Sequence, residues 1–184
     1  MHRLVCLLTL PLILWMSCTP PVTSLAESNP EKLAAMQDSL LAANPGDKTI
    51  KAALVRAHLN LAASSVKPEQ SYKNVLNLDP INAEAKYHLA LLEGHKHYKK
   101  GDNSSLWKSL EFYAQATVLV DSLGEAHYWM GRAYEKKDDR DFELIAEAYE
   151  KALSLDLSDH LRSDARHRLF EVQSRRKIFE EFWK

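Results

Sequence analysis

Apolar residues recur along this chain at the spacing of α-helices. One set has steps of four, three and four residues: Ile50, Leu54, Ala57 and Leu61. Such steps place side chains on one face of a helix, and no stretch alternates apolar and polar residues long enough to favour a strand. The pattern predicts an all-α chain, with helices over residues 30–43, 47–62, 68–78, 82–100, 104–120, 123–137, 140–155 and 159–183.

The breaks between these helices also repeat. Residues 77–85 read NLDPINAEA. The apolar residues of one predicted helix end at Leu78, Asp79 and Pro80 follow, and the next predicted helix begins a few residues later with a polar segment. Proline ends the preceding helix and is tolerated in the first turn of the next one. Similar breaks occur elsewhere, and each contains an acid or amide on which they can be aligned: Asn44, Asp79, Asp121 and Asp156. These residues are separated by 35, 42 and 35 positions. This period predicts stacked helical pairs.

Marker residues within these units identify a similar family. The stretch EAHYWMGRAYEK at 125–136 has Met130-Gly131 followed by Tyr134, and Tyr149 and Ala152 come later. Leu89-Ala90 holds the corresponding place one unit earlier, and in the first unit Leu54 and Tyr72 fit the pattern. With this period and these markers, the chain resembles the tetratricopeptide repeat family.

The resemblance implies a right-handed α-solenoid of about three helical hairpins over residues 30–184. The repeats are expected at about 48–82, 83–123 and 124–159, with a half unit before them at 30–43 and a capping helix at 160–184. The middle unit is too long for the family's period, so its helices or their connection must be extended around KKGDNSS. Leu169, Val172 and Phe179 are expected to cover the apolar end of the stack.

The resemblance also implies where a partner binds. In the family, set positions of the first helix of each pair face a groove that holds peptides. Carried over to this chain, the expected partner-binding residues are Arg56, Tyr87, His95, Tyr128, Arg132 and Lys136. Tyrosine and arginine are frequent anchors of protein recognition. We therefore expect a protein or peptide partner.

Charge and candidate chemistry narrow the function further. The 24 Lys and Arg nearly balance the 25 Asp and Glu, so no basic excess points to nucleic acid. His88 and His95, or Glu93 and His97, share a helix face, but two ligands are fewer than a zinc site needs. Without a strand, no glycine-rich phosphate loop can follow one. We expect a non-catalytic protein without a cofactor or metal.

The N-terminus has a different character. Arg3 precedes an apolar run from Leu4 to Met16, which is too short to cross a bilayer and is typical of a secretory signal peptide over residues 1–17. Ser17 before Cys18 resembles the cleavage box of bacterial lipoproteins, which implies a lipid on Cys18. Cleavage after Ala26 and an uncleaved anchor are the alternatives. Residues 18–29 are rich in Pro, Ser and Thr and are interpreted as a flexible tether.

Together these features predict an adaptor or assembly factor of the bacterial envelope. We expect it to be exported and held by its lipid at the outer membrane, facing the periplasm, where its repeats bind a protein. A secreted or soluble periplasmic form is the alternative location. Two alternative functions remain: a periplasmic module for a small ligand or metal, lined by Tyr87, His88 and His95, and a structural component that self-associates through its ends.

Overall fold

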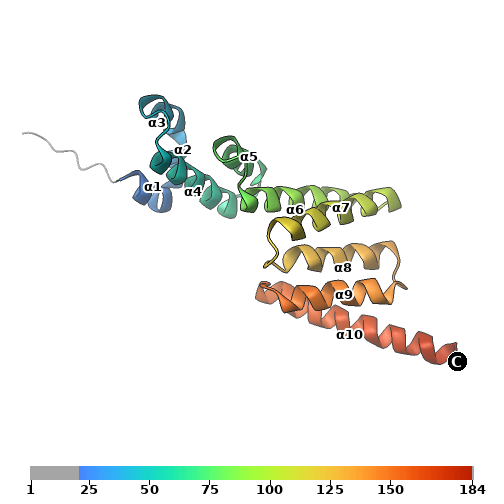
Figure 1. Cartoon of the computed structure of the whole chain (residues 1–184). Helices are drawn as coiled ribbons and strands as arrows, with labels where there is room; N and C mark the ends of the chain where they lie inside the picture. The colour runs from blue at the N-terminus through green and yellow to red at the C-terminus, as the bar shows by residue number, and fades with distance from the viewer. Residues whose placement is uncertain (1–20, 184) are drawn as a thin grey trace, which may run out of the picture.

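A computed structural model describes residues 21–183, and every regular element in that part of the chain is an α-helix (Figure 1). The signal segment and Cys18 lie outside the described residues. The helices are α1 (Val22–Ser28), α2 (Pro30–Ala35), α3 (Gln37–Ala43), α4 (Lys48–Ser64), α5 (Glu69–Leu78), α6 (Ala83–Lys100), α7 (Asn103–Leu119), α8 (Glu125–Lys137), α9 (Phe142–Ser154) and α10 (Asp159–Phe182).

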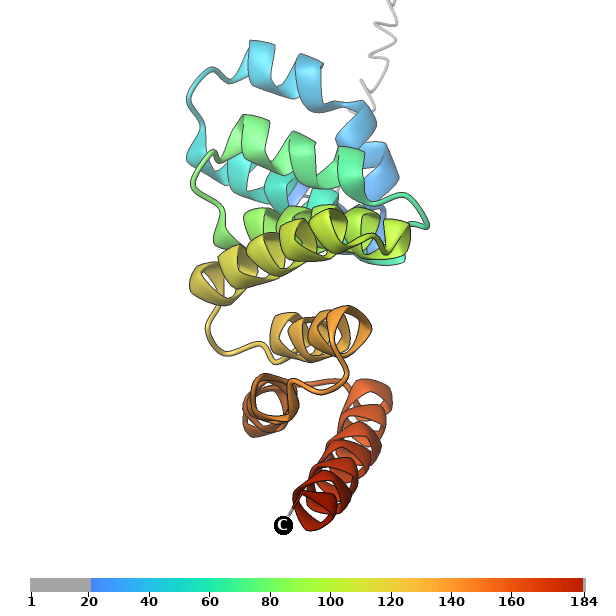
Figure 2. The same cartoon turned by 90° about the vertical axis from the view of Figure 1, so that its right-hand side faces the viewer.

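The helices pack in chain order as antiparallel hairpins, α4 with α5, α6 with α7, and α8 with α9, and α10 follows on α9. Figures 1 and 2 show α6 to α10 as successive layers, with α1 to α5 forming a block that meets this stack at α6. Each layer buries apolar residues against the next, in several linked clusters along the stack. This arrangement is a TPR-like helical stack, as the sequence predicts.

The turns at the repeat boundaries cap the helices and join neighbouring units. Asn82 Oδ1 accepts a hydrogen bond from the Ala85 amide at 3.0 Å, as expected for a residue that caps α6. Between the last two units, the Gly124 amide donates to the Asp156 carbonyl at 2.7 Å. The Asp156 amide donates to the Ser122 carbonyl at 2.9 Å. The breaks that follow α7 and α9 are therefore bonded to each other.

The middle pair is longer than the others, which confirms the expected extension. Helices α6 and α7 have 18 and 17 residues, whereas α8 and α9 have 13 each. Gly101 ends α6 with a φ of 76°, a left-handed conformation that favours glycine. Asp102 then caps α7 by accepting from the Ser105 amide at 2.9 Å. The segment KKGDNSS thus forms a tight turn between two lengthened helices.

Two expectations about the N-terminal part were wrong. The segment 18–29 was expected to be a flexible tether, but it contains α1, whose Leu25 and Ala26 are buried against α4. Seven residues are too few to show a helical period, so packing on α4 determines this helix. The single helix expected over 30–43 is interrupted at Met36, between α2 and α3. Helix α1 and the α2–α3 segment therefore form a short first hairpin rather than half a unit.

Helix α10 closes the other end of the stack. Val172 is fully buried and Leu169 is half-buried against the α8–α9 cluster, which confirms their capping position. Phe179 contacts Phe142 at the start of α9 with ring centroids 5.8 Å apart, yet it stays 44% exposed. Among residues 21–183, no helix is both long and apolar enough to span a bilayer.

Candidate functional site

The first helices of the successive pairs, α4, α6 and α8, carry the positions that the family resemblance assigns to partner binding, and α10 follows them as the last helix of the stack. We call the surface that these helices share the first-helix face. On it, α6, α8 and α10 are connected by side chains that reach from one helix to the next. Those connections decide which predicted residues are free to bind.

The side chains of Tyr128 and Arg132 on α8 are engaged in polar contacts with α10. The Tyr128 hydroxyl donates to Asp164 Oδ2 at 2.7 Å and accepts from Arg132 Nη1 at 2.9 Å. Asp164 also accepts from Arg168 Nε at 2.6 Å. Burial alone would raise the pKa of Asp164, but the hydrogen bonds from Tyr128 and Arg168 hold that pKa below its ordinary value. These polar groups join two helices.

A second set of ionic contacts extends this network to α9. Glu135 Oε2 accepts from Tyr149 Oη at 2.7 Å and from Arg168 Nη1 at 3.0 Å. Glu135 Oε1 lies 3.4 Å from Arg175 Nη2. Burial raises the pKa of Tyr149, and its bond to Glu135 adds to that effect. Because arginines and carboxylates alternate here, this part of the first-helix face neutralises its own charge.

His95 and Lys136 connect α6 with α8 around Trp129. The Trp129 ring lies 4.5 Å from the His95 ring and 5.6 Å from the Tyr98 ring, centroid to centroid. His95 Nδ1 shares a 2.9 Å hydrogen bond with the Tyr113 hydroxyl. Lys136 Nζ donates to the Tyr98 carbonyl at 2.9 Å and lies 4.5 Å from the centroid of the Tyr98 ring. Both residues stabilise the stack.

Tyr87 does not reach the first-helix face. It is fully buried in the core that α6 shares with α7 and α8, so its assignment as a partner-binding residue was wrong. The reason is the register of the middle pair. In the α8–α9 pair, Gly131 faces the Tyr149 ring, and a Cβ added there would lie 2.7 Å from that ring. In the α6–α7 pair, the glycine that faces the equivalent Tyr113 ring is Gly94. Gly94 lies one turn after Leu89-Ala90, where the family marker is expected. Tyr87 lies two turns before Gly94 and therefore on the same, buried side of α6.

Arg56 on α4 remains open to solvent. Its side chain is 67% exposed and forms an ion pair with Glu27 of α1, itself 55% exposed. An exposed ion pair of this kind contributes little stability, so it can be exchanged for a partner's carboxylate. Arg56 also lines a hollow of about 450 Å³ on the first-helix face, together with Ala52, Val55, Leu59 and Asp79.

The composition of this hollow, which we call the α4 hollow, is suited to an apolar side chain. Ala52 is exposed, while Val55 and Leu59 are half-buried against the core beneath. Asp79 on the rim already accepts from the Asn82 side-chain amide at 3.1 Å. The hollow therefore offers three apolar walls and one available cation, Arg56.

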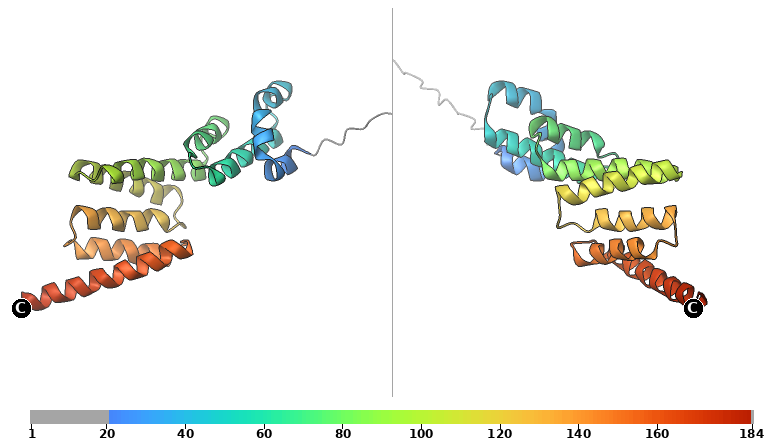
Figure 3. Two further views of the ribbon diagram at one scale, coloured as in Figure 1. Left: turned by 180° about the vertical axis from the view of Figure 1, so that it is seen from behind. Right: turned by 45° about the vertical axis from the view of Figure 1, so that its right-hand side comes forward.

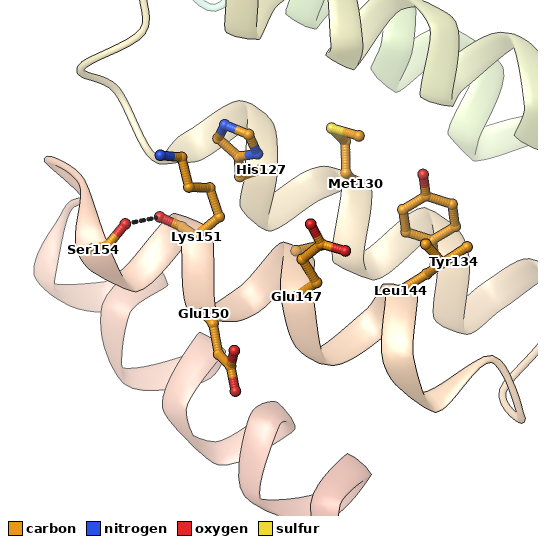
Figure 4. Close-up of a pocket in the computed structure, with 9 residues that line it drawn as sticks. His127, Met130, Tyr134, Leu144, Glu147, Glu150, Lys151 and Ser154 are labelled. Carbon is orange, nitrogen blue, oxygen red and sulfur yellow. Dashed lines mark hydrogen bonds between the residues drawn. The ribbon is translucent and has the colours of Figure 1, made fainter.

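A hollow larger than the α4 hollow lies on the opposite side of α8 (Figure 4). It measures about 650 Å³, and Met130 and Tyr134 line it from α8. These residues are two positions either side of Arg132, and two residues turn a helix by about 200°. The hollow therefore faces away from the first-helix face. Glu147, Glu150 and Lys151 of α9 contribute charged groups to it.

The histidines considered as ligands do not converge. The His88 ring stacks on Tyr72 with centroids 4.9 Å apart, whereas His95 is bonded to Tyr113. Within the described part of the chain, no three His, Cys, Asp or Glu side chains gather in a way that could hold a metal ion. The small-ligand alternative therefore gains no support from Tyr87, His88 and His95.

Sequence reasoning missed the residues that hold the face together. Trp129 lies at the centre of the contact between α6 and α8, and Asp164 and Arg168 supply the contact between α8 and α10. Trp129 precedes a marker pair and shows no periodic signal of its own. For Asp164 and Arg168, their spacing of four residues indicates only an ion pair along one helix.

These observations define an all-α, TPR-like stack whose first-helix face is filled by its own contacts at the C-terminal end and open at α4. A solved structure described as the crystal structure of MamA aligns with 89% of this chain and 98% of that chain, at 16% sequence identity and a TM-score of 0.43. No family model matches this chain. No curated protein matches it either.

Proposed function

We propose that this chain is a non-catalytic scaffold that binds a segment of another protein on the first-helix face, at the α4 hollow. The single observation that carries the proposal is the open, apolar hollow beside the exposed Arg56. A bound segment would place an apolar side chain against Ala52, Val55 and Leu59 and a carboxylate against Arg56. Removing such an anchor from water contributes about 1.5–3 kcal/mol.

The rest of the first-helix face has a supporting role in this proposal. Because Tyr128, Arg132, His95 and Lys136 already contact neighbouring helices, displacing them would leave buried polar groups without partners. A partner gains less there than at α4. The scaffold thus holds one site in place instead of using a continuous groove.

The proposal also includes attachment to the cell envelope through a lipid on Cys18. Helix α1 supports this over cleavage after Ala26, since that cleavage would remove Leu25 from the core it shares with α4. Three residues, Thr19 to Pro21, separate Cys18 from α1. At about 3.5 Å per residue they span at most roughly 10 Å, so the anchor would keep the stack close to the outer-membrane surface that faces the periplasm.

The test is a substitution that fills the hollow without touching the core. Ala52→Arg places a long side chain in the hollow at an exposed helical position, and Ala114→Arg on α7 is the matched control. After crosslinking in cells and affinity purification, we expect Ala52→Arg to reduce recovery of the partner at least tenfold and Ala114→Arg to leave it unchanged. Equal recovery from both variants would show that the α4 hollow is not the binding site.

A further inference from the structure

Helix α3 has little apolar contact with the rest of the chain. Figures 1 and 3 show it at the outer edge of the block that α1 to α5 form, away from the stack of α6 to α10. It packs mainly on α4 and α2. None of its residues is fully buried, and its apolar residues Leu40 and Leu41 are half-buried against the core of α4. Hydrophobic burial alone therefore holds α3 weakly.

A buried histidine of α4 supplies a polar contact with α3. His58 is 5% exposed, and its Nε2 shares a 2.8 Å hydrogen bond with Oε1 of Gln37, the first residue of α3. Within residues 21–183, this is the one side-chain hydrogen bond that joins α3 to α4. The other ring nitrogen, Nδ1, is buried and has no hydrogen-bond partner among the described residues. His58 thus has one partner for its two ring nitrogens.

This arrangement suits a neutral imidazole and disfavours a charged one. A neutral ring has a single N–H, which Gln37 Oε1 can accept, whereas an imidazolium has two N–H donors. The second donor would be buried at Nδ1 without an acceptor, which costs free energy. Burial accordingly lowers the pKa of His58 from its ordinary value of 6.5. Protonation of His58 therefore favours a state in which α3 has left and water reaches the ring.

The charged groups around α4 do not offset this effect. The titratable residues of α4 and of the helices packed on it are Lys48, Lys51 and Arg56 of α4, Glu27 of α1, Glu31 and Lys32 of α2, Asp38 of α3, and Glu69, Tyr72 and Lys73 of α5. Glu27 is paired with Arg56, Glu69 is paired with Lys73, and Tyr72 stacks on His88. The others are exposed. None of them contributes to the lowered pKa of His58, which burial alone produces.

We propose that His58 and Gln37 form an acid-sensitive latch, which is closed while the imidazole is neutral and opens when the imidazole is protonated. The closed latch holds α3 on α4. Its opening releases α3 and uncovers the part of the α4 core against which Leu40 and Leu41 pack. Helix α2 stays in place, because its Leu33 is fully buried in the same core. The latch is therefore closed at pH 7 and weakens as the pH falls below about 6.5.

The test is hydrogen exchange of the α3 amides at pH 7 and pH 5, in the full chain as cells process it, purified in detergent. The amides of Leu40 and Asn44 report on α3, since they donate to the carbonyls of Met36 and Leu40. After correction for the intrinsic exchange rate at each pH, we expect their protection to fall by between about three- and thirtyfold. The upper value corresponds to tenfold per pH unit over the roughly 1.5 units between 6.5 and 5.

Two variants separate the latch from a general loss of stability. His58→Gln does not titrate, so the protection of α3 is expected to be equal at both pH values. Gln37→Glu supplies a carboxylate that pairs with a charged imidazole, so protection is expected to hold or rise at pH 5. His88→Gln removes another histidine whose pKa burial lowers, and as the matched control it is expected to keep the wild-type loss.

Three results would each overturn the latch. In the first, wild-type α3 keeps its protection at pH 5. In the second, His58→Gln loses as much protection between the two pH values as the wild type does. In the third, Gln37→Glu shows that same loss. If His58→Gln leaves α3 unprotected at both pH values, Gln37→Glu decides, because only a latch that senses the charge of His58 is preserved in acid by a carboxylate at position 37.

Discussion

Two glycines determine how closely the paired helices approach at the scale of single residues. Gly94 faces the Tyr113 ring between α6 and α7, and Gly131 faces the Tyr149 ring between α8 and α9. Because a larger residue would meet the ring, these positions fix the register of each pair. The sequence identifies Gly131 from its marker motif but not Gly94, since the middle pair is extended by a turn.

Gly131→Ala is expected to destabilise the fold. At an open helical site this change would stabilise a helix by about 1 kcal/mol. Here the added Cβ would lie 2.7 Å from the Tyr149 ring, so the helices must move apart. We expect the free energy of unfolding in urea to fall by about 1–3 kcal/mol. A gain in stability would mean that α8 and α9 are not in this close contact.

The stability of the fold should depend on pH through His95. Burial between α6 and α8 lowers the pKa of His95 from 6.5 to about 4, and nearby Lys99 adds to that effect. Between these values the unfolded chain binds the proton more readily, so the free energy of unfolding falls as the pH drops from about 6.5 to 4. The expected loss from His95 is on the order of 2–3 kcal/mol.

His95→Gln isolates this contribution, because glutamine does not titrate. Burial also lowers the pKa values of His58, His88 and His127, so the wild-type curve contains several similar terms. Urea unfolding at pH 7, 5.5 and 4 should show a shallower decline for the variant than for the wild type. Parallel declines would contradict the burial of a neutral imidazole at this position.

At the scale of helices, the sequence predicts seven of the elements to within a few residues and misses α1. Regular apolar spacing predicts the long helices, and in the structure Asn82 and Asp102 cap α6 and α7. The short α1 has no period to detect, and its structure depends on Leu25 and Ala26 packing against α4, a contact between distant parts of the chain. The candidate site depends even more on contacts between distant parts of the chain. Of the six predicted partner-binding residues, Arg56 is exposed and lines the α4 hollow, whereas the positions of the others depend on contacts with neighbouring helices.

The role of α1 is tested by its removal. A chain that begins at Glu27 lacks Leu25 and the Ala26 carbonyl that accepts from Asn60 Nδ2 at 2.9 Å. Compared with a chain that begins at residue 18 with Cys18→Ser, we expect its free energy of unfolding to be lower by about 2 kcal/mol or more. A Leu25→Asp variant of the longer chain should lose a similar amount. Superimposable urea curves would indicate that α1 is a tether after all.

At the scale of the whole molecule, the period of the sequence predicts a stack of pairs, and that stack leaves two different surfaces open. Helix α4 lies near the N-terminal end and the last turns of α10 lie at the C-terminal end (Figure 1). The first carries the α4 hollow, and the second carries the exposed Ile178, Phe182 and Trp183. The contacts around Trp129 and Asp164 connect the helices between them. The proposed scaffold can therefore bind a partner at the α4 hollow without disturbing the contacts that hold the other helices together.

The most direct measurement of the proposed function is site-specific photocrosslinking in living cells. A photoreactive residue at position 52 lies in the α4 hollow, and one at position 114 is exposed on α7. We predict that position 52 yields one dominant crosslinked protein whose crosslinked peptide contains an apolar residue next to an acid, and that position 114 does not capture it. Capture at 114 but not at 52, or the same capture at both positions, would contradict a binding site at α4.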